Sequence, residues 1–183
     1  MRSDARSRKV VLVSHCLLNQ NAKVEGLARY PGVFEPLAEV LCSGEAGLLQ
    51  MPCPEVAEFG LQRPHGTDTR EQYDTPEYWE ACRRLAAEVA GLAATYRQAG
   101  YAVACVLGVE GSPSCSVERV PVIGPGGQRV LQAGQGVFTE ALVRELERAG
   151  VEVPFIGIPE TEEAGSLREA LAEVAEAIAR ASV

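Results

Sequence analysis

The sequence predicts an α/β protein in which a parallel β-sheet lies between two layers of helices. Short apolar runs rich in β-branched residues alternate with longer segments whose apolar residues recur at helical spacing. The chain has 183 residues and 46% of them are apolar, which suffices for a core without disulfides. We therefore expect one domain over residues 1–183, with residues 1–8 as an N-terminal tail.

The first half of the chain contains two predicted strands and one predicted helix. Residues 9–14 form a β-branched apolar run that ends at a turn, which is typical of a buried parallel strand. Residues 33–42 follow a Pro-Gly pair and place their apolar side chains on one helical face. The second strand, residues 48–51, ends before Cys53, whose two flanking prolines keep the backbone extended and prevent further ladder pairing.

A polar stretch and a long helix occupy the middle of the chain. Residues 59–74 are polar and contain glycine and proline, so we expect a long loop over one end of the sheet. Thr75 and the proline after it are a good helix start, and Gly100 is a good stop, which predicts a helix over residues 76–98. The third strand follows at residues 101–107.

The last third of the chain adds a small excursion and one more strand between two helices. Residues 117–134 are rich in glycine and proline, which predicts a hairpin rather than a helix. We expect helices over residues 136–149 and 161–181, with the fourth strand at residues 151–158. Strands that alternate with helices in this way are typical of a three-layer, flavodoxin-like or Rossmann-like fold with helices on both faces.

The amino-acid composition limits the kinds of molecule that the protein is expected to bind. The formal net charge is −8, from 17 basic and 25 acidic residues, which argues against nonspecific binding to nucleic acid or anionic membranes. No stretch approaches the roughly 20 apolar residues of a membrane helix, and the N-terminus lacks the features of a signal peptide. We expect a cytoplasmic protein with reduced thiols and a small-molecule substrate; the sequence leaves the oligomeric state open, a homodimer included.

Three of the six cysteines follow predicted strands in turn-forming motifs. Cys16, Cys53 and Cys115 occur in SHCLLNQN, PCPE and GSPSCS, each at a strand exit. The carboxyl ends of parallel strands meet at one edge of the sheet, where ligands bind in such folds. Three thiolates could share a metal centre there with one coordination position open for chemistry. The other three are expected to be structural or buried in the core: Cys42, Cys82 and Cys105.

The cysteine spacing leaves more than one metal possible. Structural zinc sites usually take ligands from close pairs such as C-x₂-C, and this chain has none. A catalytic zinc held by three thiolates stays open. An iron–sulfur cluster tolerates wide spacing, although four cysteines are its usual complement.

Polar residues beside the cysteines are candidates for catalysis and substrate binding. Glu55 follows Cys53 by two residues and could act as a general base on water, although a helix cap would also explain it. Ser112 and Ser114 could donate hydrogen bonds to a cluster or a substrate, although ordinary turn chemistry would also explain them. Candidate substrate contacts flank Cys16: His15, Asn19 and Lys23.

The three motifs in this order resemble the DUF523 family, which is also called the TudS family of thiouracil desulfidases. The chain is most similar to its TudS-related branch, whose first motif is SHCLLN rather than SACLLG. The resemblance extends from about residue 9 to residue 157. The resemblance implies that Cys16, Cys53 and Cys115 hold a [4Fe-4S] cluster. It also implies removal of sulfur from a thiolated base, with water replacing the sulfur at carbon and sulfide released.

One loop departs from the main family pattern. Where that family has Arg-Tyr-Asp-Gly, this chain has Lys-Val-Glu-Gly at residues 23–26, in a loop expected to contact substrate. Two rival functions also follow from the sequence. One is a cluster or sulfide carrier or sensor without turnover, and the other is a zinc-thiolate hydrolase.

Overall fold

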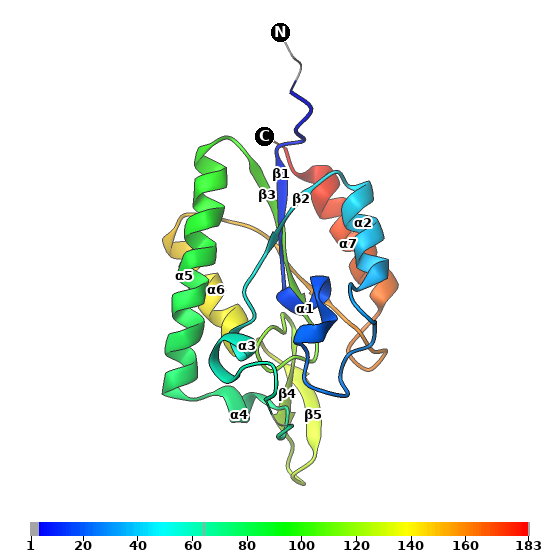
Figure 1. The fold of residues 1–183 in the computed structure, drawn as a ribbon, viewed down its shortest axis with the longest axis vertical. Coiled ribbons are helices and arrows are strands. Elements are labelled where there is room, and N and C mark those ends of the chain that lie inside the picture. Colours follow the sequence, from blue (N-terminus) through cyan, green and yellow to red (C-terminus); the bar gives the residue numbers. More distant parts are fainter. Residues whose placement is uncertain (1–3, 64, 183) are drawn as a thin grey trace.

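A four-stranded parallel sheet forms the centre of the protein, which confirms the α/β prediction (Figure 1). The computed structural model describes residues 4–63 and 65–182, so residues 1–3 of the expected tail and Pro64 of the expected loop lie outside the described part. The strand order is β2-β1-β3-β6, with β1 and β3 at the centre. The strands are β1 (Lys9–Val13), β2 (Gly47–Gln50), β3 (Ala102–Val109) and β6 (Phe155–Ile158).

Two helices cover each face of the sheet (Figure 1). On one face lie α5 (Pro76–Gln98) and α6 (Val137–Arg148), and on the other lie α2 (Glu35–Ser43) and α7 (Leu167–Arg180). Alternate residues of β1 enter the two cores, because successive side chains of a strand point to opposite faces.

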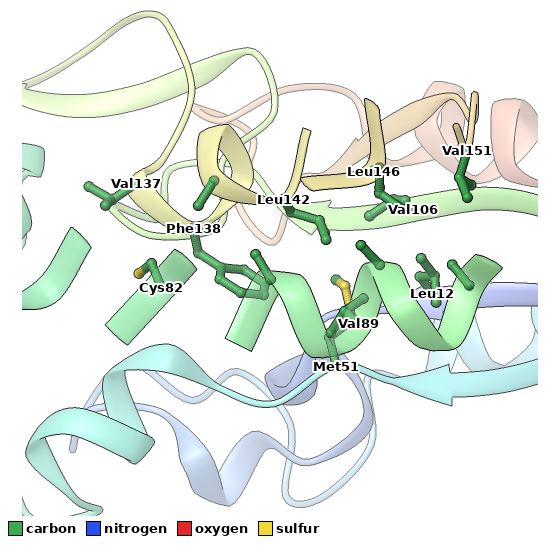
Figure 2. Packing of buried hydrophobic residues seen from close by; sticks show 14 of the residues in the cluster. Leu12, Met51, Cys82, Val89, Val106, Val137, Phe138, Leu142, Leu146 and Val151 are labelled. Carbon is green, nitrogen blue, oxygen red and sulfur yellow. The ribbon is translucent and has the colours of Figure 1, made fainter. Parts of the chain in front are cut away.

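Each face has its own buried core. Leu12 of β1, Val106 of β3, and Phe138 and Leu142 of α6 all belong to the core under α5 and α6 (Figure 2). Val11 and Val13, which point to the opposite face of β1, belong to the second core, under α2 and α7. The sheet is therefore apolar on both sides, as in other parallel sheets.

The longest helix, α5, has the limits predicted from the sequence. Thr75 caps its first turn, because the hydroxyl accepts a 3.3 Å hydrogen bond from the Tyr78 backbone N–H. Gly100 adopts φ of +78° just beyond the last turn, a conformation that glycine reaches without strain.

Residues 117–134, which were predicted to form a hairpin, do so in the structure. Strands β4 (Arg119–Ile123) and β5 (Arg129–Ala133) pair antiparallel and extend beyond the carboxyl ends of the main strands (Figure 1). This excursion places its base next to the exit of β3.

Two elements are shorter than expected. The strand predicted over residues 151–158 begins only at Phe155, and Pro154 before it has no N–H to donate to a ladder. The helix predicted from residue 161 begins at Leu167, because Gly165 has φ of +148° and Ser166 supplies the N-terminal cap.

Four short helical segments at the carboxyl end of the sheet were not predicted. The helix α1 (His15–Leu18) follows β1, and a 3₁₀ turn, η1 (Gln20–Ala22), follows α1. The helix α4 (Arg70–Tyr73) lies inside the predicted loop, whereas α3 (Pro54–Phe59) precedes that loop and ends at its first residue.

No helix in residues 4–63 and 65–182 combines the length and the apolar character that a membrane crossing requires.

Candidate functional site

A cavity of about 370 Å³ lies at the carboxyl end of the sheet, and the three motif cysteines line it. This volume is in the range of small-molecule sites. Cys16, Cys53 and Cys115 are each half-buried, and no two of them come from the same segment. The prediction that the three strand exits converge is thus met by the geometry, whereas the role of the thiols stays a prediction.

Cys16 is positioned by the end of β1. The Ser14 backbone N–H and side-chain hydroxyl both donate to the Leu107 carbonyl of β3, at 3.0 and 2.8 Å. This double contact fixes the end of β1 against β3. The chain then turns at once into α1, so that Cys16 lies in a helical turn rather than on an extended strand end.

Cys53 is held between two prolines at the start of α3. Its backbone is extended, with φ of −80° and ψ of 116°, and its carbonyl accepts the first helical hydrogen bond from the Ala57 N–H at 3.0 Å. Pro54 occupies the first turn, where a missing N–H is tolerated. Glu55 therefore lies in the first turn of a short helix.

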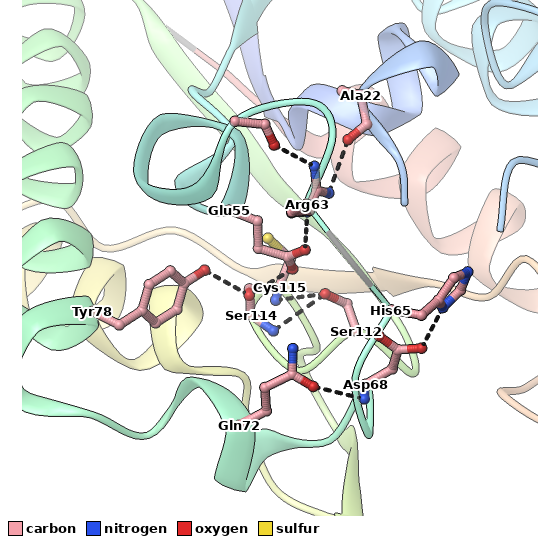
Figure 3. Close-up of polar contacts among 11 residues, drawn as sticks. Ala22, Glu55, Arg63, His65, Asp68, Gln72, Tyr78, Ser112, Ser114 and Cys115 are labelled. Atoms are coloured by element: carbon pink, nitrogen blue, oxygen red, sulfur yellow. Dashed lines mark hydrogen bonds and ion pairs between the residues drawn. The ribbon is translucent and has the colours of Figure 1, made fainter. Parts of the chain in front are cut away.

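Cys115 lies in a tight turn organised by Ser112. The Ser112 hydroxyl oxygen accepts from the Ser114 N–H at 3.2 Å and from the Cys115 N–H at 3.0 Å (Figure 3). The Cys115 carbonyl accepts from the Val109 N–H at 2.9 Å, which folds the turn back onto the end of β3. With its oxygen accepting these two N–H groups, Ser112 keeps its own proton to donate, and its side chain lines the cavity.

The three thiols share an environment that disfavours a free thiolate. Burial raises the pKa of Cys16 to about 12, against the opposing effect of the nearby Lys23 ammonium. Burial also raises the pKa of Cys53 and of Cys115, and negative charge on the neighbouring Cys16 and Cys53 raises that of Cys115 further. A metal centre removes this obstacle, because a coordinated thiol gives up its proton to the positive charge of the metal.

Glu55 is the centre of a hydrogen-bonded network beside the thiols (Figure 3). Its Oε1 accepts from the Ser114 hydroxyl at 2.7 Å, and its Oε2 accepts from Arg63 Nε at 3.1 Å. The Tyr78 hydroxyl continues the network, 2.7 Å from Ser114 Oγ. Glu55 also lines the cavity, so its carboxylate is both fixed in position and accessible to a small molecule.

Arg63 is a functional candidate that the sequence prediction missed. Its side chain is 5% exposed and also donates to the carbonyls of Ala22, at 2.9 Å, and Gly60, at 3.2 Å. It thereby joins the loop after α1 to the end of α3 and to Glu55. Nothing around it in the sequence separates it from an ordinary surface arginine.

Removing this guanidinium should destabilise the protein. We expect Arg63→Met to lower the free energy of unfolding by about 3 kcal/mol, because it leaves the partly buried Glu55 carboxylate without its ion-pair partner. Arg83→Met is the matched control, since Arg83 pairs with Glu80 on the exposed surface of α5 and should cost less than about 1 kcal/mol. Urea unfolding curves measure both, and equal losses would contradict a special role for Arg63.

Lys23 lines the cavity, as predicted for a substrate contact, and forms an ion pair there with Glu160. Glu160 was missed by the sequence prediction. It comes two residues after the end of β6, so the strand-exit rule used for the cysteines could have found it.

The other predicted contacts lie away from the cavity wall. The Asn19 side chain caps η1 by accepting from the Asn21 N–H at 3.2 Å, and His15 accepts at its carbonyl from the Gln50 amide at 3.3 Å. Neither belongs to the cavity lining in the described part of the chain. Ser114 is fully buried, and its hydroxyl contacts Tyr78 and Glu55 rather than the cavity. A substrate contact by His15 or Asn19 stays a prediction.

The segment predicted to be a long loop, residues 59–74, borders the cavity through Asp68 and Tyr73. Asp68 accepts from His65 Nδ1 at 3.0 Å, and this hydrogen bond raises the pKa of His65 (Figure 3). Tyr73 is buried. Residues of the 59–74 segment therefore form part of the cavity wall.

The remaining cysteines lie outside the cavity lining. Cys82 and Cys105 are fully buried in the two cores, as predicted. Cys42 is exposed near the end of α2, so the expectation of a structural role has no packing to support it.

Comparisons with known proteins agree with the motif resemblance. No family model matches the chain. An uncharacterized protein of Methanocaldococcus jannaschii, MJ0003, is 29% identical over 157 residues, which cover 86% of this chain and 90% of that protein. Among solved structures, the chain is similar to the [4Fe-4S]-dependent thiouracil desulfidase TudS, with a TM-score of 0.56 and 26% identity. That match covers 93% of this chain and 98% of the TudS chain. This likeness and the three motifs together support the predicted resemblance to the DUF523 family.

Proposed function

We propose that this protein is an iron–sulfur-dependent desulfidase that removes sulfur from a small thiolated heterocycle. The observation that carries the proposal is the convergence of Cys16, Cys53, Cys115 and Glu55 on one cavity. The likeness to TudS, a [4Fe-4S]-dependent thiouracil desulfidase, supports it. The overall reaction exchanges the substrate's C=S for C=O, with water as the source of oxygen and hydrogen sulfide as the other product.

The donor set suits an iron–sulfur cluster. Cys16, Cys53 and Cys115 would hold three of the four irons of a [4Fe-4S] cluster, since thiolates are the usual ligands of such clusters. Among residues 4–63 and 65–182, no three His, Cys, Asp or Glu side chains form a group that could hold a metal ion. A cluster does not require such a group, because each of its thiolates binds a different iron. When bound, the cluster would supply a Lewis-acidic iron that lacks a protein ligand and has affinity for sulfur.

The protein's own residues would handle the water and its protons. Glu55 would accept a proton from water, because its carboxylate lines the cavity while Arg63 and Ser114 hold it in one orientation. Ser112 would donate its hydroxyl proton to the substrate or to a cluster sulfur. Ser114 would act by positioning Glu55, since its hydroxyl is directed to the carboxylate.

Other parts of the proposal rest on the sequence. A small-molecule substrate fits the size of the cavity. The cytoplasmic location, the single-domain organisation and any homodimer stay predictions.

Reconstitution under anaerobic conditions tests the proposal. The purified chain, loaded with iron and sulfide, is expected to bind about four irons, to show the visible absorption of an iron–sulfur protein, and to release sulfide catalytically from thiouracil. Cys16→Ala, Cys53→Ala and Cys115→Ala should each lose most of the cluster. Cys42→Ala is the matched control, because Cys42 is exposed on α2 and should leave iron content unchanged.

Three results would contradict the proposal. Transfer of no more than one sulfide per protein would identify a carrier. Activity in air with zinc, without the cluster absorption, would identify a zinc-thiolate hydrolase. A full cluster in one of the three cysteine variants would remove that cysteine from the ligand set.

A further inference from the structure

Lys23 and Glu160 form a partly buried ion pair in the wall of the cavity, and the proposed chemistry does not use it. The Lys23 side chain is 13% exposed and that of Glu160 is 7% exposed. They come from opposite ends of the chain, one after η1 and the other after β6. Both line the cavity that also contains the three thiols.

A buried glutamine fixes this pair relative to Cys16. The Gln20 amide nitrogen donates to Glu160 Oε1 at 2.7 Å and to the Cys16 carbonyl at 3.1 Å. The Gln20 amide oxygen accepts from the Arg29 N–H at 2.9 Å, so the amide has partners at both ends. The Glu160 carboxylate is therefore held at a set position beside one of the proposed cluster ligands.

A partly buried ion pair adds little net stability, because desolvation offsets most of the attraction between the charges. The Lys23–Glu160 pair nevertheless keeps unused hydrogen-bonding capacity. An ammonium has three donors and a carboxylate has about four acceptor sites. Within the described residues, Lys23 donates to Glu160, and Glu160 accepts from Lys23 and Gln20. A donor and an acceptor thus stand side by side at the cavity surface.

The charge of the surrounding wall favours an uncharged ligand. The cavity lining has five acidic and four basic side chains, before any charge on the thiols is counted. Apolar residues of the same cavity lining, among them Val24, Leu27 and Ala164, offer a surface for a flat ring. An anion would meet net repulsion here, whereas a neutral heterocycle would not.

We propose that the Lys23–Glu160 pair recognises the polar edge of the substrate ring, with Glu160 accepting a ring N–H and Lys23 donating to an adjacent ring carbonyl. This inference rests on the proposed function and assigns the residues that select among thiolated rings. Rings that carry an N–H beside a C=O are then bound in preference to rings in which that N–H is blocked. A blocked ring leaves the carboxylate without its partner, and charged hydrogen bonds are costly to lose.

Two ring substrates and two variants test the assignment. Glu160→Gln and Lys23→Met are compared with the wild-type chain, all cluster-loaded, on 4-thiouracil and on its 1,3-dimethyl derivative. Both ring nitrogens are methylated because methylation at N3 alone would leave the N1–H beside the same carbonyl. Equilibrium dialysis measures binding, and sulfide release measures KM and kcat. Each variant is expected to weaken binding of 4-thiouracil roughly tenfold or more. Each should bind the methylated ring much as the wild type does, with kcat and iron content changed far less than KM.

Glu162→Gln is the matched control, because Glu162 is an exposed carboxylate two residues after Glu160 and is not part of the cavity lining. It should leave the affinity for both rings unchanged. Equal loss of affinity for both rings in Glu160→Gln and Lys23→Met would overturn the assignment and show a pair that only joins two loops. Unchanged affinity in both variants would overturn it as well. If the wild type binds 4-thiouracil with the expected variant pattern but releases no sulfide, the proposed function fails and the recognition pair stands.

Discussion

Replacing Glu55 with glutamine is expected to reduce sulfide release by roughly 10²- to 10⁴-fold, the usual contribution of a general acid or base. The substitution keeps the size of the side chain but removes its ability to take a proton. The hydrogen bonds of the surrounding network can be kept, although Arg63 loses the negative charge that it pairs with. The amide oxygen can accept from Arg63, and the amide nitrogen can donate to Ser114 Oγ. The Ser114 hydroxyl can then donate to Tyr78, since either oxygen of that pair can be the donor.

The experiment therefore separates chemistry from assembly. Iron content and cluster absorption of Glu55→Gln should match those of the wild type while kcat falls. The thermal unfolding midpoint should be lower, because the buried Arg63 guanidinium loses its counter-charge. Glu58→Gln is the control, because Glu58 lies one turn later in α3 and is exposed. A Glu55→Gln variant with wild-type kcat would show that another group takes the proton.

Replacing Gly136 with alanine should damage both the fold and the proposed cluster site. A Cβ at this position would lie 2.3 Å from the Ser114 carbonyl carbon and 2.4 Å from its oxygen, where backbone atoms have no room to yield. The turn that contains Cys115 must then move away from α6. We expect a loss of about 1–3 kcal/mol in the free energy of unfolding, as for other overpacked sites, together with reduced iron binding after reconstitution.

The same substitution, glycine to alanine, should have the opposite effect on stability at Gly91. It lies on the exposed side of α5, and a methyl group added there would have no atom within 4 Å. Gly91→Ala should therefore stabilise the protein by up to about 1 kcal/mol through helix propensity. Thermal unfolding and iron content measured on both variants complete the comparison. Wild-type stability and full iron binding in Gly136→Ala would show that the turn around Cys115 tolerates displacement.

Regular elements were predictable where local signals and burial agree. The run at β1 and the capped helix α5 were found within one residue of their limits, because both carry strong start and stop signals. The short helices α1, α3 and α4 were missed, because four to six residues show no helical periodicity and such helices depend on tertiary contacts. The late start of β6 depends on Pro154, whose effect on pairing the sequence prediction did not include.

The residues of the candidate site were also predictable only in part. The strand-exit rule brings together Cys16, Cys53 and Cys115, because parallel strands present their carboxyl ends at one edge. It cannot supply Arg63 or Tyr78, since their partners are distant in the sequence and their direction depends on side-chain packing. Residue type alone did not distinguish Ser112, which lines the cavity, from Ser114, which is buried against Glu55.

The strand order of the sheet also has a consequence for biosynthesis. The central strand β1 is made early, but its partner β3 follows only after the whole of α5, and the outer strand β6 comes near the end. While the chain is being synthesised, Cys16 and Cys53 leave the ribosome long before Cys115 can join them. Insertion of the proposed cluster would therefore have to wait until the segment with Cys115 has joined the sheet.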